Sequence, residues 1–462
     1  MEFEEKRDKQ RIDFKNKKVL DYEKVLEITT DYLTQNFSDI ILNLFDEENK
    51  ENIKNQLQSK IKKYLQDNSL AVKNMNTNEL IEKIYIDAFE FTFLNKYIFD
   101  ENVEEINCNS WDCIYVNFSD GRIVQLDEKF QDGEQALSVV RRILAISNNR
   151  VNDAEPIALG DIGKNRRITV MIPPIVDDEV GVTFSLRNVN SANIDAKTFL
   201  EKGTATEEML DFLEIMLKYG VSVCIAGGTG SGKTTLTNWL LSTIPNNKRI
   251  YTIESGSREL DLVKKDENGE IINNVVSTKT KENKNKEFSV DQDKLLQIAL
   301  RFHPDVICVG EMRDKEAYTA QEASRTGHNI ITTVHADSAE DTYDRILTLS
   351  LKSNNNINDE RLFKYIIKAF PIVIFAKQLE DSDKSRKIME IMEGYIDNDD
   401  KIRFNTIFNF EVEKTDIDIE KNKVSIIGNH KKIGGISEKL AKRLRNNGIP
   451  TNELRKLIRE EK

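Results

Sequence analysis

A glycine-rich stretch of eight residues constrains the fold of this chain more than any other feature. It reads G-G-T-G-S-G-K-T from Gly227 to Thr234, directly after the apolar run 221–226 and directly before the helical pattern 235–241. Glycines allow backbone N–H groups to turn inward on a phosphate group, and the start of a helix adds its positive end. This order therefore predicts a strand, a phosphate-binding loop and a helix.

The same stretch predicts how a nucleotide is held. The Lys233 ammonium is expected to reach the β- and γ-phosphates of ATP, and the Thr234 hydroxyl to bind the Mg²⁺ ion that bridges them. The residues that we expect to contact the nucleotide here are Gly227, Gly228, Thr229, Gly230, Ser231, Gly232, Lys233, Thr234 and Thr235.

Two glutamates follow strand-like apolar runs elsewhere in the chain. Glu311 ends the run 305–311, which reads D-V-I-C-V-G-E, and Glu254 follows the run 249–253. Ligands of an open parallel sheet bind at the carboxyl ends of its strands, so both carboxylates are expected beside the phosphates. There both are candidate catalytic residues and Mg²⁺ ligands; Glu311 takes a proton from an attacking water or holds the shell of the ion. A lone glutamate at a strand end is otherwise an ordinary solvated side chain.

Two of the four histidines, His328 and His335, flank the apolar run 329–334. A neutral imidazole can hydrogen-bond to a phosphate or to a catalytic carboxylate, so both are candidate sensors of the γ-phosphate. Taken alone, each is more often a structural hydrogen-bonding residue. The absence of a cysteine or a further histidine near them in the sequence disfavours zinc.

Changes in residue pattern divide the chain into four segments. Residues 1–96 are predicted to form a helical N-terminal extension, since most of this segment lacks proline and glycine and has apolar residues at helical spacing. Residues 97–189 contain short alternating runs and predict a small mixed α/β domain with a hairpin turn at Gly121. Residues 190–203 form a linker, and a second compact domain occupies 204–462.

The second domain is predicted to contain a parallel sheet covered on both faces, because strand-like runs alternate with helical patterns. The expected strands are 221–226, 249–253, 306–309, 329–334 and 372–375. Residues 261–288 are polar without an apolar period, which predicts a surface loop or hairpin. The tail from about residue 431 is basic, and a solvated basic face is favoured there over membrane contact.

Composition disfavours some classes of function. The 67 Lys and Arg and 79 Asp and Glu give a net charge of −12, so the chain repels phosphate backbones and a dedicated nucleic-acid-binding protein is disfavoured. The N-terminus shows no secretory signal, and no apolar run approaches the ~20 residues that span a bilayer. Four widely spaced cysteines indicate a reduced, cytoplasmic protein without a cysteine-bound metal.

Four motifs follow one another in a specific order. They are a Walker A loop at 227–234, an acidic box at 252–254, a Walker B segment at 300–313 and a histidine box at 326–335. In this order they resemble the secretion ATPases of the type II/type IV superfamily, and most closely the CpaF-type ATPases of tight-adherence (Tad) pilus systems. The resemblance extends from about Tyr97 to the C-terminus and includes the tail signature at 434–449.

The resemblance implies an α/β fold with a RecA-like P-loop ATPase core, and a PAS-like domain at 97–189. It implies a cytoplasmic ATPase that uses ATP and Mg²⁺ and works as a ring of six subunits. The ring is expected at the cytoplasmic face of the inner membrane, on a polytopic platform protein. Arg167 and Arg187 lie in segments that resemble the family's arginine-bearing stretches, which marks them as candidate catalytic residues, with Arg301 and Arg313 as alternatives in the core.

Three classes of function are consistent with these residues. The first is an ATP-hydrolysing motor that powers pilus assembly, of the type IV or Tad-like kind, or protein secretion. The second is a RecA-like nucleic-acid translocase, against which the net charge and the lack of basic stretches with aromatic residues stand. The third is a non-hydrolysing, nucleotide-gated scaffold, which would lack a catalytic carboxylate, whereas Glu254 and Glu311 are both present.

Overall fold

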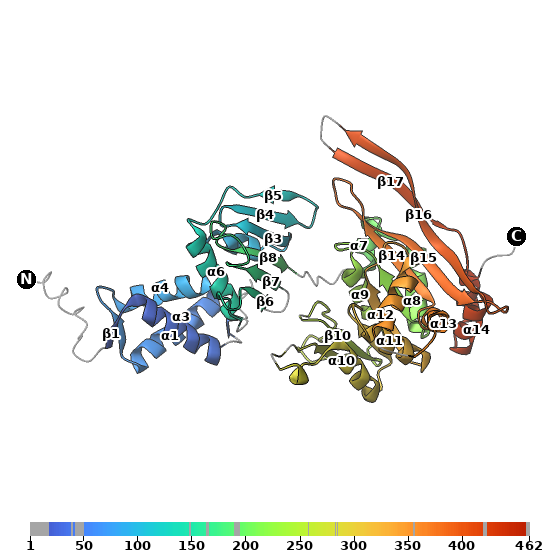
Figure 1. Cartoon of the computed structure of the whole chain (residues 1–462), viewed down its shortest axis with the longest axis horizontal. Coiled ribbons are helices and arrows are strands. Elements are labelled where there is room, and N and C mark those ends of the chain that lie inside the picture. Colours follow the sequence, from blue (N-terminus) through green and yellow to red (C-terminus); the bar gives the residue numbers. More distant parts are fainter. Residues whose placement is uncertain are drawn as a thin grey trace, which may run out of the picture. The chain divides into compact units, whose positions relative to one another are not determined.

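The chain divides into two compact units, residues 1–190 and 191–462, drawn from blue to green and from green to red in Figure 1. This computed structural model describes residues 18–37, 40–41, 50–146, 149–162, 166–188, 195–256, 258–281, 283, 285–353, 356–418 and 423–458. Residues 190–194 of the predicted linker lie outside these ranges. No helix among the described residues is long and apolar enough to cross a membrane.

The first part of the first unit is mainly helical, as predicted. Its helices are α1 (Tyr22–Asn36), α3 (Lys50–Asp67), α4 (Thr77–Phe89), the 3-10 helix η5 (Thr92–Leu94) and α5 (Asn95–Ile98). A capping box starts α4, in which Asn76 and Glu79 bond to each other's backbone N–H groups. Two short strands, β1 (Lys18–Leu20) and β2 (Leu70–Val72), also pair in parallel, which the residue pattern does not predict.

The second part of the first unit is a six-stranded antiparallel sheet with one helix. Its elements are β3 (Val103–Ser110), β4 (Cys113–Phe118), β5 (Ile123–Gln125), α6 (Gly133–Ile146), β6 (Ile157–Ile162), β7 (Arg166–Met171) and β8 (Thr183–Asn188). The strand order is β5-β4-β3-β8-β7-β6. The predicted hairpin is confirmed, because β4 and β5 pair across Gly121, whose φ is +89°.

One continuous hydrophobic core joins the two parts of the first unit. It includes Ile106 and Leu186 of the sheet, Ile143 of α6, and Leu57 and Ile84 of the helical part, all fully buried. The helical extension therefore packs as part of this unit, since the buried apolar side chains among its described residues belong to the same cluster as those of the sheet. The boundary at residues 96 and 97 and the PAS-like assignment stay predictions.

The second unit is built on a nine-stranded sheet. Its strands are β9 (Val223–Ala226), β10 (Arg249–Glu254), β11 (Asn274–Lys279), β12 (Val306–Val309), β13 (Asn329–Val334), β14 (Ile372–Gln378), β15 (Arg386–Ile396), β16 (Ile402–Asp418) and β17 (Lys423–Lys432). Their order is β11-β10-β12-β13-β9-β14-β15-β16-β17. The five predicted strands are confirmed and pair in parallel. The sheet is not parallel throughout, however, because β14 to β17 form an antiparallel meander.

Helices cover both faces of this sheet, as predicted. They are α7 (Ala196–Glu201), α8 (Glu207–Lys218), α9 (Lys233–Ser242), α10 (Gln292–Ala299), α11 (Glu316–Arg325), α12 (Asp341–Leu351), α13 (Asp359–Ala369), α14 (Glu438–Asn446) and α15 (Thr451–Leu457), with the 3-10 helices η6 (Lys286–Phe288) and η7 (Leu300–Phe302). Helices α8, α9, α14 and α15 share one core with Ile225 and Ile331. Helices α10 to α13 share the other with Cys224 and Ile330. Side chains alternate between the faces of a strand, so both faces of the central strands must be apolar.

The polar segment 261–288 is more than a surface loop. Its residues 274–279 form β11, which pairs in parallel with β10 at the edge of the sheet. Leu262 is buried in the core of the second unit. The rest of the segment is largely exposed. Residues 274–279 therefore form a strand despite their polar composition, because they pair with β10.

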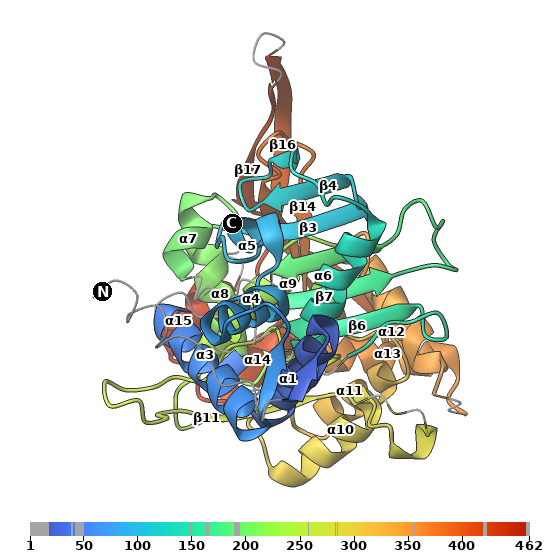
Figure 2. The same ribbon diagram turned by 90° about the vertical axis from the view of Figure 1, so that its left-hand side faces the viewer.

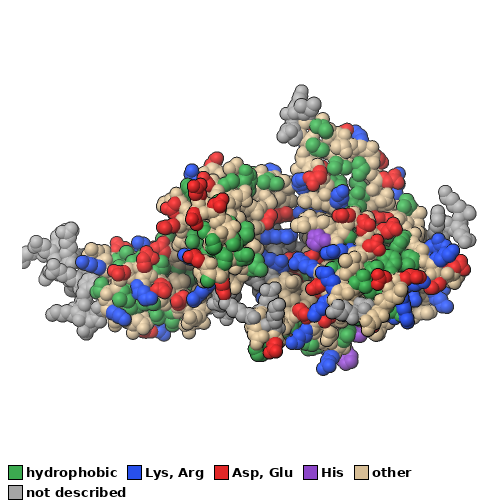
Figure 3. Space-filling model, viewed as in Figure 1, with side chains coloured by type: hydrophobic (Ala, Val, Ile, Leu, Met, Phe, Trp, Pro, Cys, Tyr) green, Lys and Arg blue, Asp and Glu red, His purple; other side chains and the backbone are tan. Residues whose placement is uncertain are grey.

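The basic tail is packed, and the antiparallel hairpin before it projects. In α14, the Ser437 hydroxyl accepts a hydrogen bond from the Leu440 N–H, and Arg443 donates to the Gly220 carbonyl at 2.6 Å. The far part of the β16–β17 hairpin extends away from the rest of the unit (Figure 2). Hydrophobic, acidic and basic side chains are interspersed along it (Figure 3).

Candidate active site

The glycine-rich loop connects the carboxyl end of β9 to the first turn of α9. Gly227 has φ +151°, and a Cβ atom there would lie 2.1 Å from the Ala376 carbonyl oxygen. Gly232 has φ +87° at the residue before α9. Only glycine fits these backbone conformations and this close approach without strain, which explains why the loop needs glycine at both ends.

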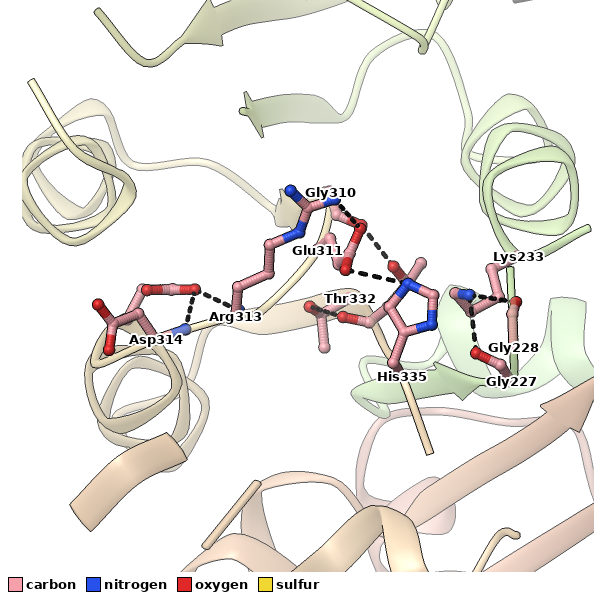
Figure 4. A network of polar contacts seen from close by, with 11 residues as sticks. Gly227, Gly228, Lys233, Gly310, Glu311, Arg313, Asp314, Thr332 and His335 are labelled. Atoms are coloured by element: carbon pink, nitrogen blue, oxygen red, sulfur yellow. Dashed lines mark hydrogen bonds and ion pairs between the residues drawn. The ribbon is translucent and has the colours of Figure 1, made fainter. Parts of the chain in front are cut away.

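Lys233 lies folded over the loop. Its side chain is buried, with 8% exposed. Its ammonium donates to the carbonyl oxygens of Gly227 at 2.8 Å and Gly228 at 2.7 Å (Figure 4). Ser231 donates to the same Gly228 oxygen at 2.8 Å. The positive charge of Lys233 is therefore held against the carbonyl oxygens of its own loop.

The remaining loop residues differ in exposure. Gly228 and Thr229 are exposed at the loop surface, whereas Thr234 and Thr235 are half-buried in the first turn of α9. The half-buried Thr234 directly follows the buried Lys233 in the chain.

Glu311 lies two residues beyond the end of β12, next to Gly310, at the same edge of the sheet. Its Oε2 accepts from the Arg313 guanidinium at 2.7 Å, and its Oε1 lies 3.3 Å from His335 Nε2 (Figure 4). Two hydrogen bonds fix this turn against β13, because Met312 N–H donates to Thr333 O and the Thr333 hydroxyl donates to Gly310 O. The carboxylate thus joins residues from two neighbouring strand ends.

The surroundings keep Glu311 ionised. Partial burial would raise the pKa of its carboxyl group. The hydrogen bond and charge of Arg313, with the charges of His335 and Lys233, outweigh burial and leave the pKa below its usual value. The carboxylate is therefore charged at neutral pH.

His335 follows β13 and is neutral at pH 7. Burial and the positive charge of Lys233 lower the pKa of its imidazole, and the opposing effect of Glu311 does not compensate. Its contact with Glu311 is therefore that of a neutral imidazole with a carboxylate, and not an ion pair. This is the protonation state expected of a phosphate sensor.

Glu254, the last residue of β10, lies beside Gly310. A Cβ atom on Gly310 would be 3.6 Å from its Cγ. Its Oε1 accepts from the backbone N–H groups of Glu259 at 2.6 Å and Leu260 at 3.0 Å, while the buried Oε2 has no hydrogen-bond partner. Burial is the main cause that raises the pKa of this carboxyl group.

These residues fit a magnesium ion that is bound together with a nucleotide. No group of three or more His, Cys, Asp or Glu side chains that could hold a metal occurs among the described residues. Mg²⁺ needs no such cage, because it takes a hydroxyl, phosphate oxygens and waters. The free Oε2 of Glu254 and the Thr234 hydroxyl at the start of α9 are suited to this shell.

His328 does not belong to this edge of the sheet. It precedes β13, whereas His335 follows it, and six residues of strand separate the two by about 20 Å. The prediction that both histidines contact the phosphates is therefore wrong for His328 within one chain. Its buried Nδ1 has no hydrogen-bond partner among the described residues.

Arg167 and Arg187 lie in the first unit, on neighbouring strands. They are directly opposite each other in the β7–β8 pair. Arg187 is also opposite Glu105 of β3, and its side chain is exposed. Arg187 therefore has Arg167 on one side and Glu105 on the other as its cross-strand neighbours.

Two residues near the loop were not predicted from the sequence. Arg386 donates to Gly230 O at 2.7 Å, and Gln378 lies against the same glycine. Both are about 150 residues from the loop in sequence, without a local motif. Arg313 is held on Glu311, and Glu316 of α11 accepts from its backbone N–H at 2.6 Å.

The sheet and the residues at its carboxyl edge define a P-loop protein of the α/β class. Residues 87–402 match the family described as "Type II/IV secretion system protein". Because this match covers more than half of the chain, the chain belongs to that family.

Similar proteins include members of transport systems. The chain is 26% identical over 291 residues to the type IV secretion system protein VirB11 of Bartonella quintana, covering 55% of this chain and 79% of that protein. It is 28% identical over 270 residues to the uncharacterized protein MJ0900 of Methanocaldococcus jannaschii, covering 57% of this chain. The matched part spans 45% of that archaeal protein, which is less than half of its length. Among solved structures, the ATPase DotB of Yersinia pseudotuberculosis is 16% identical with a TM-score of 0.49, covering 66% of this chain and 79% of that one.

Proposed function

We propose that this chain is an ATP-hydrolysing motor that powers the assembly of a type IV or Tad-like pilus, or protein secretion. The observation that carries the proposal is that Lys233, Glu311 and His335 lie at the carboxyl ends of neighbouring parallel strands of one sheet. Membership of the secretion family supports the same conclusion. The ionised Glu311 argues against a non-hydrolysing scaffold.

Each group has a chemical task in this proposal. The loop N–H groups and Lys233 bind the β- and γ-phosphates, and Glu311 orients the attacking water and accepts its proton. The neutral His335 donates a hydrogen bond to the γ-phosphate or to Glu311. Bound Mg²⁺, held through Thr234 and the water shell of Glu254 or Glu311, would neutralise charge on the phosphates.

The partners follow from the same proposal. Six copies of the chain form a ring at the cytoplasmic face of the inner membrane and act on a polytopic platform protein. The resemblance of 434–449 to the Tad subgroup supports a Tad-type system. These residues include α14, whose Leu440 and Leu444 are buried in the same core as the apolar side chains of α8.

A hydrolysis assay tests the proposed function. The purified chain should convert ATP to ADP and phosphate only with Mg²⁺, and single-stranded DNA should leave the rate unchanged because the chain carries a net charge of −12. Release of phosphate is measured with and without EDTA and with and without DNA. Strong stimulation by DNA would favour the translocase, and ATP binding without turnover would favour the scaffold.

Arg187→Ala should lower ATP turnover by about 10³ and leave ATP binding nearly intact. An arginine outside the phosphate loop commonly neutralises charge in the transition state of phosphoryl transfer. The assay compares phosphate release and nucleotide affinity in the assembled protein. Arg122→Ala is the matched control, since Arg122 pairs with Asp120 at the β4–β5 turn. Normal turnover after replacing both Arg187 and Arg167 would assign the role to Arg301 or Arg313.

A further inference from the structure

The outer side of the phosphate loop is covered by two side chains from the β14–β15 hairpin. Arg386, the first residue of β15, donates from Nε to the Gly230 carbonyl oxygen at 2.7 Å. A Cβ atom on Gly230 would lie 2.9 Å from Gln378 Oε1, and one on Gly232 would lie 3.4 Å from Arg386 Cδ. Gln378 and Arg386 are themselves direct partners in the β14–β15 pair.

The hydrogen bond from Arg386 fixes one peptide plane of the loop. In a planar trans peptide, the carbonyl of Gly230 and the N–H of Ser231 point in opposite directions. When Arg386 holds the oxygen on the outer side, the Ser231 N–H is turned to the inner side. The next residues of the loop are also held by hydrogen bonds, because Ser231 Oγ and the Lys233 ammonium both donate to the Gly228 oxygen. An N–H group with this orientation is a donor for an anion.

The turn before Arg386 is closed by several hydrogen bonds. Asp381, with 8% exposed, accepts from the Ser385 N–H at 2.7 Å and from the Ser385 hydroxyl at 2.6 Å. Leu379 N–H donates to Ser385 O, which closes the hairpin. Ser382 exchanges two hydrogen bonds with Val424 of β17, at 2.9 and 2.8 Å. The guanidinium is therefore supported from its own hairpin and from the next one.

We propose that Arg386 is a positioning residue for the nucleotide-binding loop. It acts through the Gly230–Ser231 peptide, which it holds with the N–H directed at the phosphates, and Gln378 packs beside it on the same glycine. The inference rests on the proposed function, because it concerns the affinity of the same loop for a nucleotide. Its effect falls on binding and not on the chemical step, since Glu311 and His335 lie on other strands.

The test compares Arg386→Met, Arg386→Lys and the control Arg403→Met. Arg403 lies on β16 of the same sheet and bonds to Asp397 at 2.8 Å, away from the loop. Arg386→Met should raise the Kd of ADP and the KM of ATP by about tenfold or more, while kcat changes by less than about threefold. Arg386→Lys keeps a charged donor and should restore part of the affinity. Arg403→Met should leave all three constants unchanged.

The result separates this inference from the function on which it rests. An Arg386→Met variant with the Kd and KM of the wild type, or one that loses kcat alone, would overturn the positioning role. A wild-type chain that binds no ADP would overturn the proposed function as well. Thermal unfolding of each variant is followed by circular dichroism. Arg386→Gln carries the same expectation of raised Kd and KM, and replaces Arg386→Met should that variant not fold.

Discussion

Lys233→Ala should abolish ATP hydrolysis. Within the phosphate loop, Lys233 supplies the one side-chain cation, and its ammonium is already buried against Gly227 O and Gly228 O. A triphosphate bound there brings negative charge that the loop amides alone do not neutralise, and such charge is costly in a site that excludes water. We expect turnover to fall to the background of the assay and the Kd of ATP to rise. Phosphate release and fluorescent-nucleotide binding measure the two effects.

Lys248→Ala is the matched control for this variant. Lys248 lies in the same unit just before β10 and pairs with Asp305 at 2.7 Å, but it is at the amino end of the strand and half-exposed. Its removal should change turnover little, because an exposed ion pair contributes only about 0–1 kcal/mol to stability. Normal turnover by folded Lys233→Ala would contradict the assignment of the nucleotide site.

The parallel half of the fold and the phosphate loop were predictable from local sequence. Each central strand is buried on both faces, so it appears as a short apolar run, as in 223–226 and 306–309. The loop has a fixed order of glycines and one lysine. The glycines are required for steric reasons, and the lysine is required for its positive charge. Both signals are contained in fewer than ten residues, so no long-range information is needed to recognise them.

The antiparallel strands β15 to β17 were not predicted, although the first part of β16 has a sequence with a period of two. Residues 402–412 alternate as I-R-F-N-T-I-F-N-F-E-V, which is the pattern of a strand with one buried face. The charged residues among them, such as Arg403 and Glu411, make the segment resemble a polar region by composition. Periodicity, and not composition, carries the signal there.

The histidine prediction failed for a geometric reason. A strand of six residues separates its two flanking positions by its whole length, so residues close in sequence lie at opposite edges of the sheet. His335 follows β13 and meets Glu311, and His328 precedes it. The direction of the strand decides between them, and the parallel pairing of β13 with β9 sets that direction.

Other features of the site depend on tertiary contacts that no local pattern encodes. Glu254 was expected at the carboxyl edge, but its bonds to the backbone of Glu259 and Leu260 depend on how the chain turns after β10. Arg386 and Gln378 reach the loop because β14 is the sheet neighbour of β9. β9 and β14 are neighbours in the sheet but about 150 residues apart in the sequence, so their pairing cannot be predicted from either segment alone.

Glu311→Gln should bind ATP with little change and hydrolyse it up to about 10⁴-fold more slowly. The amide keeps the size of the carboxylate and an oxygen for Arg313, but it removes the negative charge and the group that accepts a proton. Nucleotide affinity and single-turnover hydrolysis separate binding from chemistry. Affinity should even rise slightly, because a negative charge beside the γ-phosphate has been removed.

Glu254→Gln tests whether Glu311, and not Glu254, accepts the proton from the attacking water. Its Oε1 can still accept from Glu259 and Leu260 N–H, so folding should be preserved. The pH profile gives a second criterion. The pKa of Glu311 lies below its usual 4.5 and that of His335 below its usual 6.5, so wild-type turnover should stay level from pH 8 to about 6.5 and fall only in more acidic buffer. If Glu254→Gln is inactive while Glu311→Gln turns over normally, then the buried carboxylate of β10 accepts the proton, and an acid limb at higher pH should accompany that result because its pKa is raised.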